Sequence, residues 1–346
     1  MRILIVKLSS LGDVVHAMPA VQDILNALPE VELDWVVERG FAPLVRRCSG
    51  VHRVIECELR RWRKTPLAPA TRAAWRAFKR DLQAQSYDAV IDLQGLTKSA
   101  LVAWLACLAP GGRRYGLANQ TDGSGFEAPA RWVAHVAVTL PQRSHAVTRS
   151  RAMCAQALGY GPASSMSFGL LAQTGSAQGA INSEANHATA CAGQVALVHG
   201  TSRADKEWPV AQWQALGQRL NAAGHGVVLP HGSAAEEATA HEIAAGLADA
   251  TVWPRLGLDA LTDALAGCVG VIGVDSGLSH MAVALDLPHV QIYNFDTAWR
   301  TGPLVLPRDA LTPVHPRQCS VFAHPAPSLE AVWQAWLRVF APTRLA

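Results

Sequence analysis

The sequence lacks the glycine-rich fingerprints by which many α/β proteins bind nucleotides. No G-x-G-x-x-G follows the first predicted strand, and no G-x-x-x-x-G-K-[ST] occurs in the 346 residues. These absences argue against a nucleotide-dependent oxidoreductase and against a P-loop enzyme. The chain also has no Asp-x-Asp motif, and its histidines are not spaced as metal ligands. We therefore predict neither a metal nor a cofactor.

Paired cysteines and long apolar runs are missing as well. The seven cysteines, at positions 48, 57, 107, 154, 191, 268 and 319, include no C-x-x-C pair. Such spacing is typical of reduced thiols, so we predict a cytoplasmic location. Only Ile3 to Val6 is apolar before Lys7, and the longest later run, Ala100 to Ala109, is too short to span a bilayer. We predict no signal peptide and no transmembrane helix.

Charged residues are scarce, at 16%, whereas half of the chain is hydrophobic, a composition that supports a large core. Residues 1–160 carry 21 Lys and Arg against 13 Asp and Glu, a net charge of +8, while the remainder has a net charge of −5. A basic first half indicates an anionic partner such as nucleic acid, a membrane surface or an acidic glycan, with solvated surface charge as the alternative. Nucleic acid is disfavoured because no recognised RNA or DNA motif is present.

Strand and helix patterns alternate along both halves of the chain. Strands are predicted at 2–6, 33–37, 54–56, 89–92, 195–198, 227–230, 271–274 and 290–293, and helices over 14–28, 42–48, 70–85, 97–108, 210–222, 233–247 and 328–340. A stretch rich in Gly, Ala and Ser, 159–194, predicts a linker. We therefore predict an α/β protein with two Rossmann-like domains, 1–165 and 190–325, that face each other across a cleft. For the helix of the C-terminal segment, 326–346, packing back on the N-terminal domain is one option.

The stretch from Val271 to Ala284 reads V-I-G-V-D-S-G-L-S-H-M-A-V-A and predicts a buried strand followed by a helix. Asp275 or Ser276 can cap that helix, and Gly277 allows a ligand to approach closely. The free N–H groups of the first helical turn favour a phosphate. The alternative is an ordinary capped turn with His280 one turn into the helix.

Three further clusters carry candidate chemistry. Asp13 follows the first strand and suits a lone general base, with a helix N-cap as the alternative. Thr201, Ser202 and Lys206 follow the first strand of the second half, where they can meet a pyrophosphate or face solvent. The densest basic run can bind phosphates or carboxylates, or it can simply be solvated. It comprises Arg60, Arg61, Arg63 and Lys64, and Lys98 is expected near it.

Five segments, taken in order, resemble the lipopolysaccharide heptosyltransferase I family. They are K-L-S-S-L-G-D-V-V-H-A-M-P-A (Lys7 to Ala20), R-R-W-R-K (Arg60 to Lys64), D-L-Q-G-L-T-K-S (Asp92 to Ser99), D-K-E-W-P (Asp205 to Pro209) and V-D-S-G-L-S-H (Val274 to His280). The match spans nearly the whole chain. The chain departs from the family at Asn294 to Thr297, where relatives usually show Gly-Pro-Thr. The loop Gln120 to Glu127 lacks an Arg that relatives often place before the Glu.

The resemblance implies a GT-B fold and an inverting, metal-independent transfer of L-glycero-D-manno-heptose from ADP-heptose to the Kdo region of Kdo-lipid A. It implies Asp13 as the general base and Lys206 as the group that stabilises the leaving diphosphate. The implied donor set is Thr201, Ser202, Glu236 (with Glu237 as its alternative), Asp275, Ser276, Gly277, Leu278 and His280, and the implied acceptor set is Arg60, Arg61, Arg63, Lys64 and Lys98. A cytoplasmic enzyme, bound peripherally to the inner membrane and without nucleic acid as a partner, is also implied.

Two other functions stay open from the sequence. One is a sister transferase that adds the second heptose or uses another nucleotide sugar, and the other is a non-catalytic binder of anionic glycan or nucleotide. Asp13 discriminates between transfer and binding, because a binder has no need of an unpaired carboxylate in a cleft. A glycosidase would need two such carboxylates.

Overall fold

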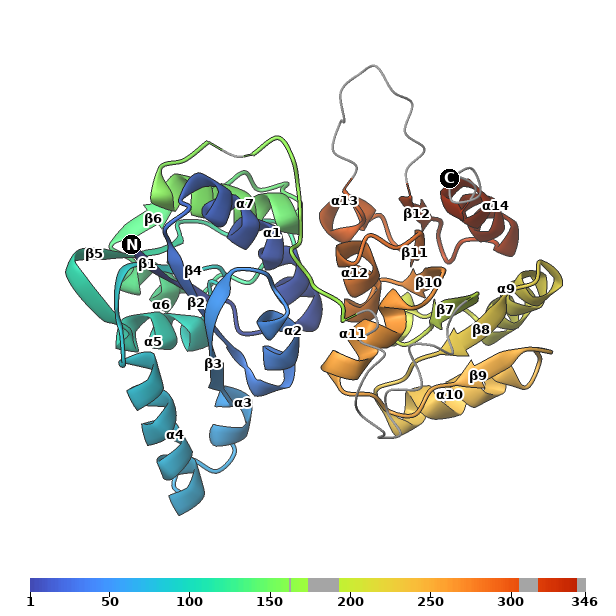
Figure 1. Ribbon diagram of the computed structural model, residues 1–346, viewed down its shortest axis with the longest axis horizontal. Helices are drawn as coiled ribbons and strands as arrows, with labels where there is room; N and C mark the ends of the chain where they lie inside the picture. Colours follow the sequence, from blue (N-terminus) through green and yellow to red (C-terminus); the bar gives the residue numbers. More distant parts are fainter. Residues whose placement is uncertain (162, 174–192, 305–316, 341–346) are drawn as a thin grey trace. The chain divides into compact units, whose positions relative to one another are not determined.

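The computed structural model describes residues 1–161, 163–173, 193–304 and 317–340. The chain forms two compact units, Met1–Leu170 and Leu171–Ala346, which Figure 1 colours from blue to green and from yellow to red. Most of the predicted linker, 174–192, lies outside the described residues. The residues of the predicted linker up to Leu170 belong to the first unit, where Leu170 forms an antiparallel bridge with Cys48.

A six-stranded parallel sheet forms the middle of the first unit. Its strands are β1 (Arg2–Val6), β2 (Glu32–Glu38), β3 (Val51–Cys57), β4 (Ser86–Asp92), β5 (Cys107–Leu117) and β6 (Val136–Val138), in the order β3-β2-β1-β4-β5-β6. The register pairs Ile3 with Leu33 on one side and with Ala89 on the other. Ile3 to Val6 are fully buried, as expected of a parallel strand that helices cover on both faces.

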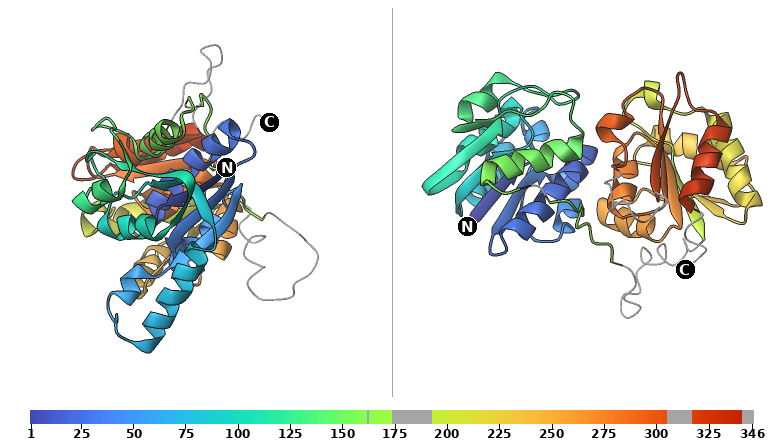
Figure 2. Two further views of the ribbon diagram at one scale, coloured as in Figure 1. Left: turned by 90° about the vertical axis from the view of Figure 1, so that its left-hand side faces the viewer. Right: turned by 90° about the horizontal axis from the view of Figure 1, so that it is seen from above.

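Helices cover both faces of this sheet (Figure 2). They are α1 (Leu11–Ala27), α2 (Ala42–Arg46), α3 (Leu59–Trp62), α4 (Pro69–Leu82), α5 (Thr97–Leu105), α6 (Ala128–Val133) and α7 (Ala146–Leu158). α1 and α7 pack on each other, joined by a buried ion pair with 2.7 Å between Arg151 Nε and Asp23 Oδ2. Phe78 of α4 and Val102 of α5 pack in one cluster with Leu4 of β1. Each helix thus turns an apolar stripe toward the sheet.

The second unit repeats this arrangement. Its elements are β7 (Gln194–Val198), α9 (Val210–Ala222), β8 (Gly226–Leu229), α10 (Ala234–Ala244), β9 (Ala250–Val252), α11 (Leu258–Ala266), β10 (Gly270–Val274), α12 (Gly277–Ala284), β11 (His289–Tyr293), α13 (Ala298–Thr301), β12 (Gln318–Phe322) and α14 (Leu329–Phe340). The sheet has the order β12-β11-β10-β7-β8-β9 and is parallel throughout its described pairings. Counted from the first strand of each unit, both sheets therefore have the order 3-2-1-4-5-6.

This strand order determines where each unit can bind a ligand. In the first unit, successive strands from β1 to β3 are added on one side of β1, and those from β4 to β6 are added on its other side. In the second unit, the order changes in the same way between the neighbours β7 and β10. Ligands of doubly wound sheets bind beyond the carboxyl ends of the strands at this switch point. The loops that follow β1, β4, β7 and β10 are therefore the candidate sites.

Four strands of the structure were not predicted from apolar patterns. β5 contains Pro110, three glycines and two arginines, and its register with β4 shifts between Tyr87 and Ala89. β6 and β9 have only three residues each, and β12 is only partly buried. None of them forms the continuous apolar run that marks a fully buried strand. The helix predicted over 97–108 ends at Leu105, because the chain enters β5 at Cys107.

The last helix, α14, packs on the sheet of the second unit. Val332, Trp336 and Val339 are buried in one cluster with residues of β10 and β11. A Cβ at Gly270 would lie 2.6 Å from the ring of Trp336, so the helix lies directly on β10. The apolar stripe of α14 is therefore covered within its own unit.

Two other sequence expectations concern cysteines and membrane spans. The six cysteines within the described ranges form no disulfide. Burial raises the pKa of the Cys48 thiol to about 12, which keeps this side chain protonated at neutral pH. None of the described helices combines the length and the hydrophobicity needed to cross a membrane.

Candidate active site

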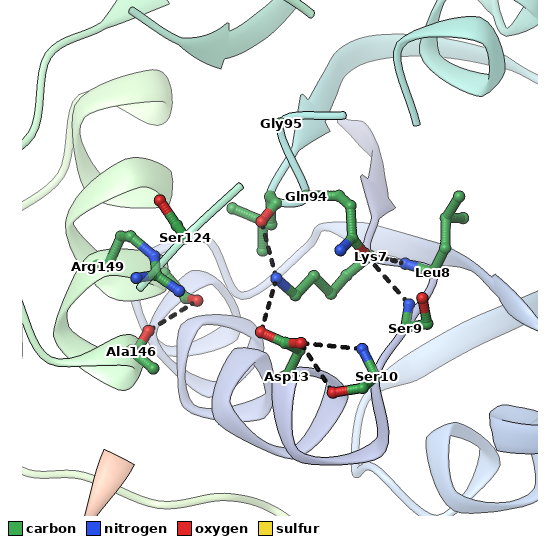
Figure 3. Close-up of polar contacts among 12 residues, drawn as sticks. Lys7, Leu8, Ser9, Ser10, Asp13, Gln94, Gly95, Ser124, Ala146 and Arg149 are labelled. Atoms are coloured by element: carbon green, nitrogen blue, oxygen red, sulfur yellow. Dashed lines mark hydrogen bonds and ion pairs between the residues drawn. The ribbon is translucent and has the colours of Figure 1, made fainter. Parts of the chain in front are cut away.

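Asp13 lies at the switch point of the first unit, in the first turn of α1 (Figure 3). The N-cap of α1 is Ser10, and Asp13 occupies the third helical position. Its Oδ2 accepts hydrogen bonds from Ser10 N and Ser10 Oγ, each 2.9 Å long, which is one half of a capping box. The Asp13 side chain nevertheless stays 38% exposed, so a hydroxyl group can reach its carboxylate.

Lys7 is the neighbour of this carboxylate that sequence patterns did not single out. It is buried at the end of β1, where Nζ donates to Leu93 O over 3.0 Å and lies 3.5 Å from Asp13 Oδ1. Burial lowers the pKa of the Lys7 ammonium, against the attraction of Asp13. Burial also opposes the charge of Asp13, but Lys7 and the Ser10 hydrogen bonds outweigh it and hold the pKa of that carboxyl below its ordinary value. Asp13 is therefore ionised at neutral pH.

The loops after β1 and β4 are joined next to this pair. Gln94 Oε1 accepts hydrogen bonds from the backbone N–H groups of Leu8 and Ser9, over 3.1 and 3.2 Å. The Ser9 hydroxyl in turn accepts from Lys98 Nζ at 2.9 Å and from Arg60 Nη2 at 3.3 Å. Two members of the predicted acceptor set thus reach the loop that leads into α1.

The rest of the predicted acceptor set points elsewhere. Arg61 Nη2 lies 2.9 Å from a carboxylate oxygen of Glu58. Arg63 lines a groove beside α4, and Lys64 is exposed where α3 ends. Trp62, in the middle of the run, is buried, with 6% of its surface exposed. The basic run therefore covers the short helix α3 and the turn after it, distributes its cations around a buried tryptophan, and does not form a single basic surface.

Arg149 of α7 is a second cation that the motifs did not reveal. It is buried, donates from Nη1 to Thr121 Oγ1 over 3.3 Å, and so ties α7 to the loop Gln120 to Glu127. Its charge contributes to lowering the pKa of both Lys7 and Asp13. Figure 3 shows the side chain of Arg149, on α7, together with Lys7 and Asp13. The loop that departs from the family pattern is thus connected to the Asp13 site through Arg149.

In the second unit, Lys206 and Asp275 form an ion pair at the switch point between β7 and β10. Lys206 Nζ lies 2.6 Å from Asp275 Oδ2, and the two side chains are 19% and 7% exposed. Asp275 Oδ1 lies 3.4 Å from His280 Nε2 and accepts from Thr301 over 3.4 Å. Burial opposes the charge of Asp275, but His280 and Lys206 outweigh it and hold the pKa of the carboxyl far below its usual range. Asp275 is therefore a fixed anion that positions Lys206.

The first turn of α12 adds backbone donors next to this pair. Ser276 caps the helix, with its Oγ 3.5 Å from Ser279 N, and Gly277 and Leu278 follow it. The N–H groups of a first helical turn have no partner within the helix and favour an anion. A Cβ at Gly273 would lie 2.4 Å from Ser279 Oγ, so only glycine lets the helix lie this close to β10.

Glu236 lies over the loop that follows β7, whereas Glu237 does not. Gly200 belongs to this loop, and its backbone lies so close to Glu236 that an added Cβ would be 2.8 Å from the carboxyl carbon of Glu236. Glu236 Oε2 also accepts a hydrogen bond from Gly232 N over 2.6 Å. Glu237 is half-exposed and lies 3.9 Å from His231. The structure therefore brings Glu236, and not its neighbour, to the candidate donor loop.

Thr201 and Ser202 are also adjacent in sequence but differ in their contacts. Thr201 Oγ1 donates to the carbonyl oxygen of Asp275 over 3.2 Å, and this bond joins the loops that follow β7 and β10. Ser202 is exposed. The structure thus gives Thr201 a positioning contact and leaves the Ser202 hydroxyl at the surface of the loop.

Asn294, at the first position that departs from the family pattern, contacts the Lys206 loop. Its side chain is buried after β11, and Nδ2 donates to the carbonyl oxygens of Asp205 and Glu207 over 3.2 and 2.8 Å. These carbonyls belong to the residues on either side of Lys206. Asn294 therefore fixes the backbone from which the Lys206 side chain extends.

The two switch points thus offer complementary chemistry. The first has a charged, accessible carboxylate that can take a proton from a hydroxyl group. The second has an ammonium group and helical N–H donors that suit a diphosphate. Within the described ranges, no three His, Cys, Asp or Glu side chains gather as a metal site would require.

Comparisons with known proteins point to one family. The model of glycosyltransferase family 9 (heptosyltransferase) matches residues 75–320. Lipopolysaccharide heptosyltransferase 1 of Pseudomonas aeruginosa is 39% identical over 87% of this chain and 81% of its own length. The E. coli heptosyltransferase WaaC, solved with ADP, is 33% identical with a TM-score of 0.80, and its structure with ADP-2-deoxy-2-fluoro heptose has a TM-score of 0.73. Both comparisons cover 96% of this chain and 98% of the solved one. The chain therefore has a GT-B-like fold and belongs to glycosyltransferase family 9, the heptosyltransferases.

Proposed function

We propose that this enzyme transfers L-glycero-D-manno-heptose from ADP-heptose to the Kdo region of Kdo-lipid A, with inversion, during synthesis of the lipopolysaccharide inner core. The similarity to lipopolysaccharide heptosyltransferase 1, and to a heptosyltransferase solved with ADP and with an ADP-heptose analogue, supports this assignment. The observation that carries it is the Asp13 carboxylate, which is ionised, accessible and located at the switch point of the first unit.

Asp13 acts as the general base in this proposal. A sugar hydroxyl of the acceptor donates its proton to the carboxylate while its oxygen attacks the anomeric carbon of the heptose. Lys7 and Ser10 keep the carboxylate charged before the reaction. Because Lys7 and Ser10 stabilise the charged form of Asp13, they also make this carboxylate a weaker base. The proton therefore moves as the new C–O bond forms and the attacking hydroxyl becomes acidic. One displacement at the anomeric carbon inverts its configuration.

Lys206 and the first turn of α12 stabilise the leaving diphosphate in this proposal. Negative charge grows on the diphosphate as the bond to heptose breaks, so donors fixed in advance stabilise the transition state more than the ground state. Asp275 occupies one ammonium N–H of Lys206, and the other two have no partner among the described residues. Thr201, Glu236, Asp275 and His280 complete the donor site, and the reaction needs no metal.

The acceptor meets the first unit in this proposal, where Arg60 and Lys98 flank the loop that leads to Asp13. The carboxylates of Kdo supply the opposite charge. The enzyme works in the cytoplasm, peripherally bound to the inner membrane, because its acceptor is a membrane lipid.

A transfer assay with EDTA tests this function. The full chain, ADP-heptose and Kdo-lipid A are expected to give heptosylated acceptor by mass spectrometry and one ADP per transfer, at a rate that added magnesium does not raise. Activity that returns only with magnesium would contradict the metal-independent mechanism. A chain that uses only an already heptosylated acceptor is the sister transferase, and one that binds both substrates without transfer is a binder.

The acceptor assignment predicts the effect of removing two cations. Arg60→Ala together with Lys98→Ala is expected to raise the KM for Kdo-lipid A by about 10-fold or more, because each charge-assisted contact is worth roughly 1.5–3 kcal/mol before solvent screening. The affinity for ADP, measured by calorimetry, should not change. Arg61→Ala is the matched control, since Arg61 pairs with Glu58. Loss of ADP affinity with an unchanged acceptor KM would reverse the assignment of the two units.

A further inference from the structure

The first unit has a groove of about 700 Å³ beside α3, α4 and α5, and Lys98 is its one lining residue that the proposed reaction uses. Figures 1 and 2 show α3 and α4 side by side, extending from the rest of the unit. The groove has an apolar part, formed by Leu59, Trp62, Pro66, Trp75 and Leu101, and a cationic part. An apolar groove bordered by charges of one sign suits an anionic amphiphile.

The apolar part combines packed aromatic rings with side chains that are open to solvent. Trp62 and Trp75 are in edge-to-face contact with ring centroids 5.6 Å apart, and both pack against Phe78. Leu101 is 40% exposed, and Trp104, one turn further along α5, is 61% exposed. Exposed apolar side chains that adjoin a groove indicate a binding surface when they are contiguous.

The cations at the groove have no anionic partners of their own. Arg63, Arg72 and Arg76 line it, and none lies within 4 Å of a carboxylate in the part of the chain that the structure describes. Two nearby arginines outside the groove do have anionic partners: Arg53 Nη2 lies 2.6 Å from Asp81 Oδ1, and Arg61 pairs with Glu58. The groove is therefore bordered by arginines whose positive charge no carboxylate of the described residues neutralises.

α5 connects the groove to the Asp13 loop. Lys98, Leu101 and Trp104 are three residues apart and lie along one side of the helix. Lys98 lines the groove and also donates to Ser9 Oγ over 2.9 Å. One molecule can therefore place a polar end near Asp13 and extend an apolar part along α5 into the groove.

We propose that this groove binds the lipid anchor of the acceptor, with an acyl chain against Trp75 and Leu101 and a phosphate at Arg72 and Arg76. This inference rests on the proposed function, because it takes Kdo-lipid A as the acceptor. The opposite signs of the lipid A phosphates and the unpaired arginines favour it, as does the order of groups along α5, with the cation nearest Asp13 and the apolar residues beyond it.

Equilibrium binding to two acceptors tests the proposal without relying on turnover. Kdo-lipid A in detergent micelles and the same acceptor stripped of its acyl chains are titrated against the full chain by calorimetry. Leu101→Asp is expected to raise the Kd for the acylated acceptor by about 10-fold, equivalent to about 1.4 kcal/mol, and to change the Kd for the deacylated one less than about 2-fold. Arg72→Ala with Arg76→Ala should weaken both, because both carry phosphate.

Leu337→Asp on α14 is the matched control, since Leu337 is a leucine of similar exposure, 43%, in the second unit. Equal Kd values for Leu101→Asp and the parent would overturn the proposal. So would a variant that binds Kdo-lipid A normally in detergent but loses binding to phosphatidylglycerol vesicles, because the surface would then contact the bilayer. If the parent binds Kdo-lipid A but transfers no heptose, the proposed function fails while the groove assignment stands.

Discussion

Replacing Asp13 by Asn is expected to lower turnover by about 10²-fold or more, with ADP-heptose affinity and the fold retained. Asparagine keeps an oxygen that can accept the Ser10 hydrogen bonds but cannot take a proton at neutral pH. The measurement is the steady-state rate of ADP release, with calorimetry for donor affinity and circular dichroism for the fold.

Asp259→Asn is the control for Asp13→Asn, because Asp259 is also a carboxylate in the first turn of a helix, α11. It should cost stability of the order of 0.3–1 kcal/mol without affecting turnover. The pH profile gives an independent check. The pKa of Asp13 is below its ordinary value, so the base is lost only as pH falls through that lower pKa, and the rate should stay level from neutral pH to about pH 5. Near-parental turnover of Asp13→Asn would reduce Asp13 to a structural role.

Replacing Lys206 by Met is expected to lower kcat by about 10²–10³-fold, the usual cost of removing one fixed donor to a developing negative charge. Lys206 is the only lysine in residues 171–346, so no other ammonium group of that half can take its place. Methionine retains much of the apolar stem. Single-turnover kinetics with saturating ADP-heptose separates the chemical step from donor binding.

Arg203→Met is the control for Lys206→Met. Arg203 lies in the same loop, but it is exposed and paired with Asp205. A surface pair of this kind contributes little, so its loss should change kcat by less than about 2-fold. If both variants lose activity equally, the loop conformation matters and the Lys206 ammonium has no special role.

The sequence predicted most of the strands and helices that form the candidate site. β1, β7 and β10 are buried on both faces, so they appear as continuous apolar runs, and α12 begins at an evident cap, Ser276. Asp13 and Asp275 lie just after such runs. A carboxylate that follows the carboxyl end of a buried parallel strand is where a site of this fold class is expected, so the amino-acid pattern is enough to single out both residues as candidates.

Other parts of the site depend on contacts between distant segments, which periodicity does not reveal. Lys7 immediately follows a buried strand, and that position was the available signal, but its role depends on Leu93, 86 residues away. Asn294 acts through two carbonyls nearly 90 residues earlier. The run from Arg60 to Lys64 appeared to be one surface because its charges are adjacent in sequence. Burial of Trp62 within α3 separates them.

All six strands of the first sheet lie within residues 2–138, and those of the second within 194–322. No strand is exchanged between the two described sheets. All hydrogen bonds between the strands of one sheet therefore form within a segment shorter than half of the chain. Shorter loops cost less entropy to close, and domains generally fold as they leave the ribosome. The half that carries the proposed base can therefore complete its sheet while the half that carries Lys206 is still being synthesised.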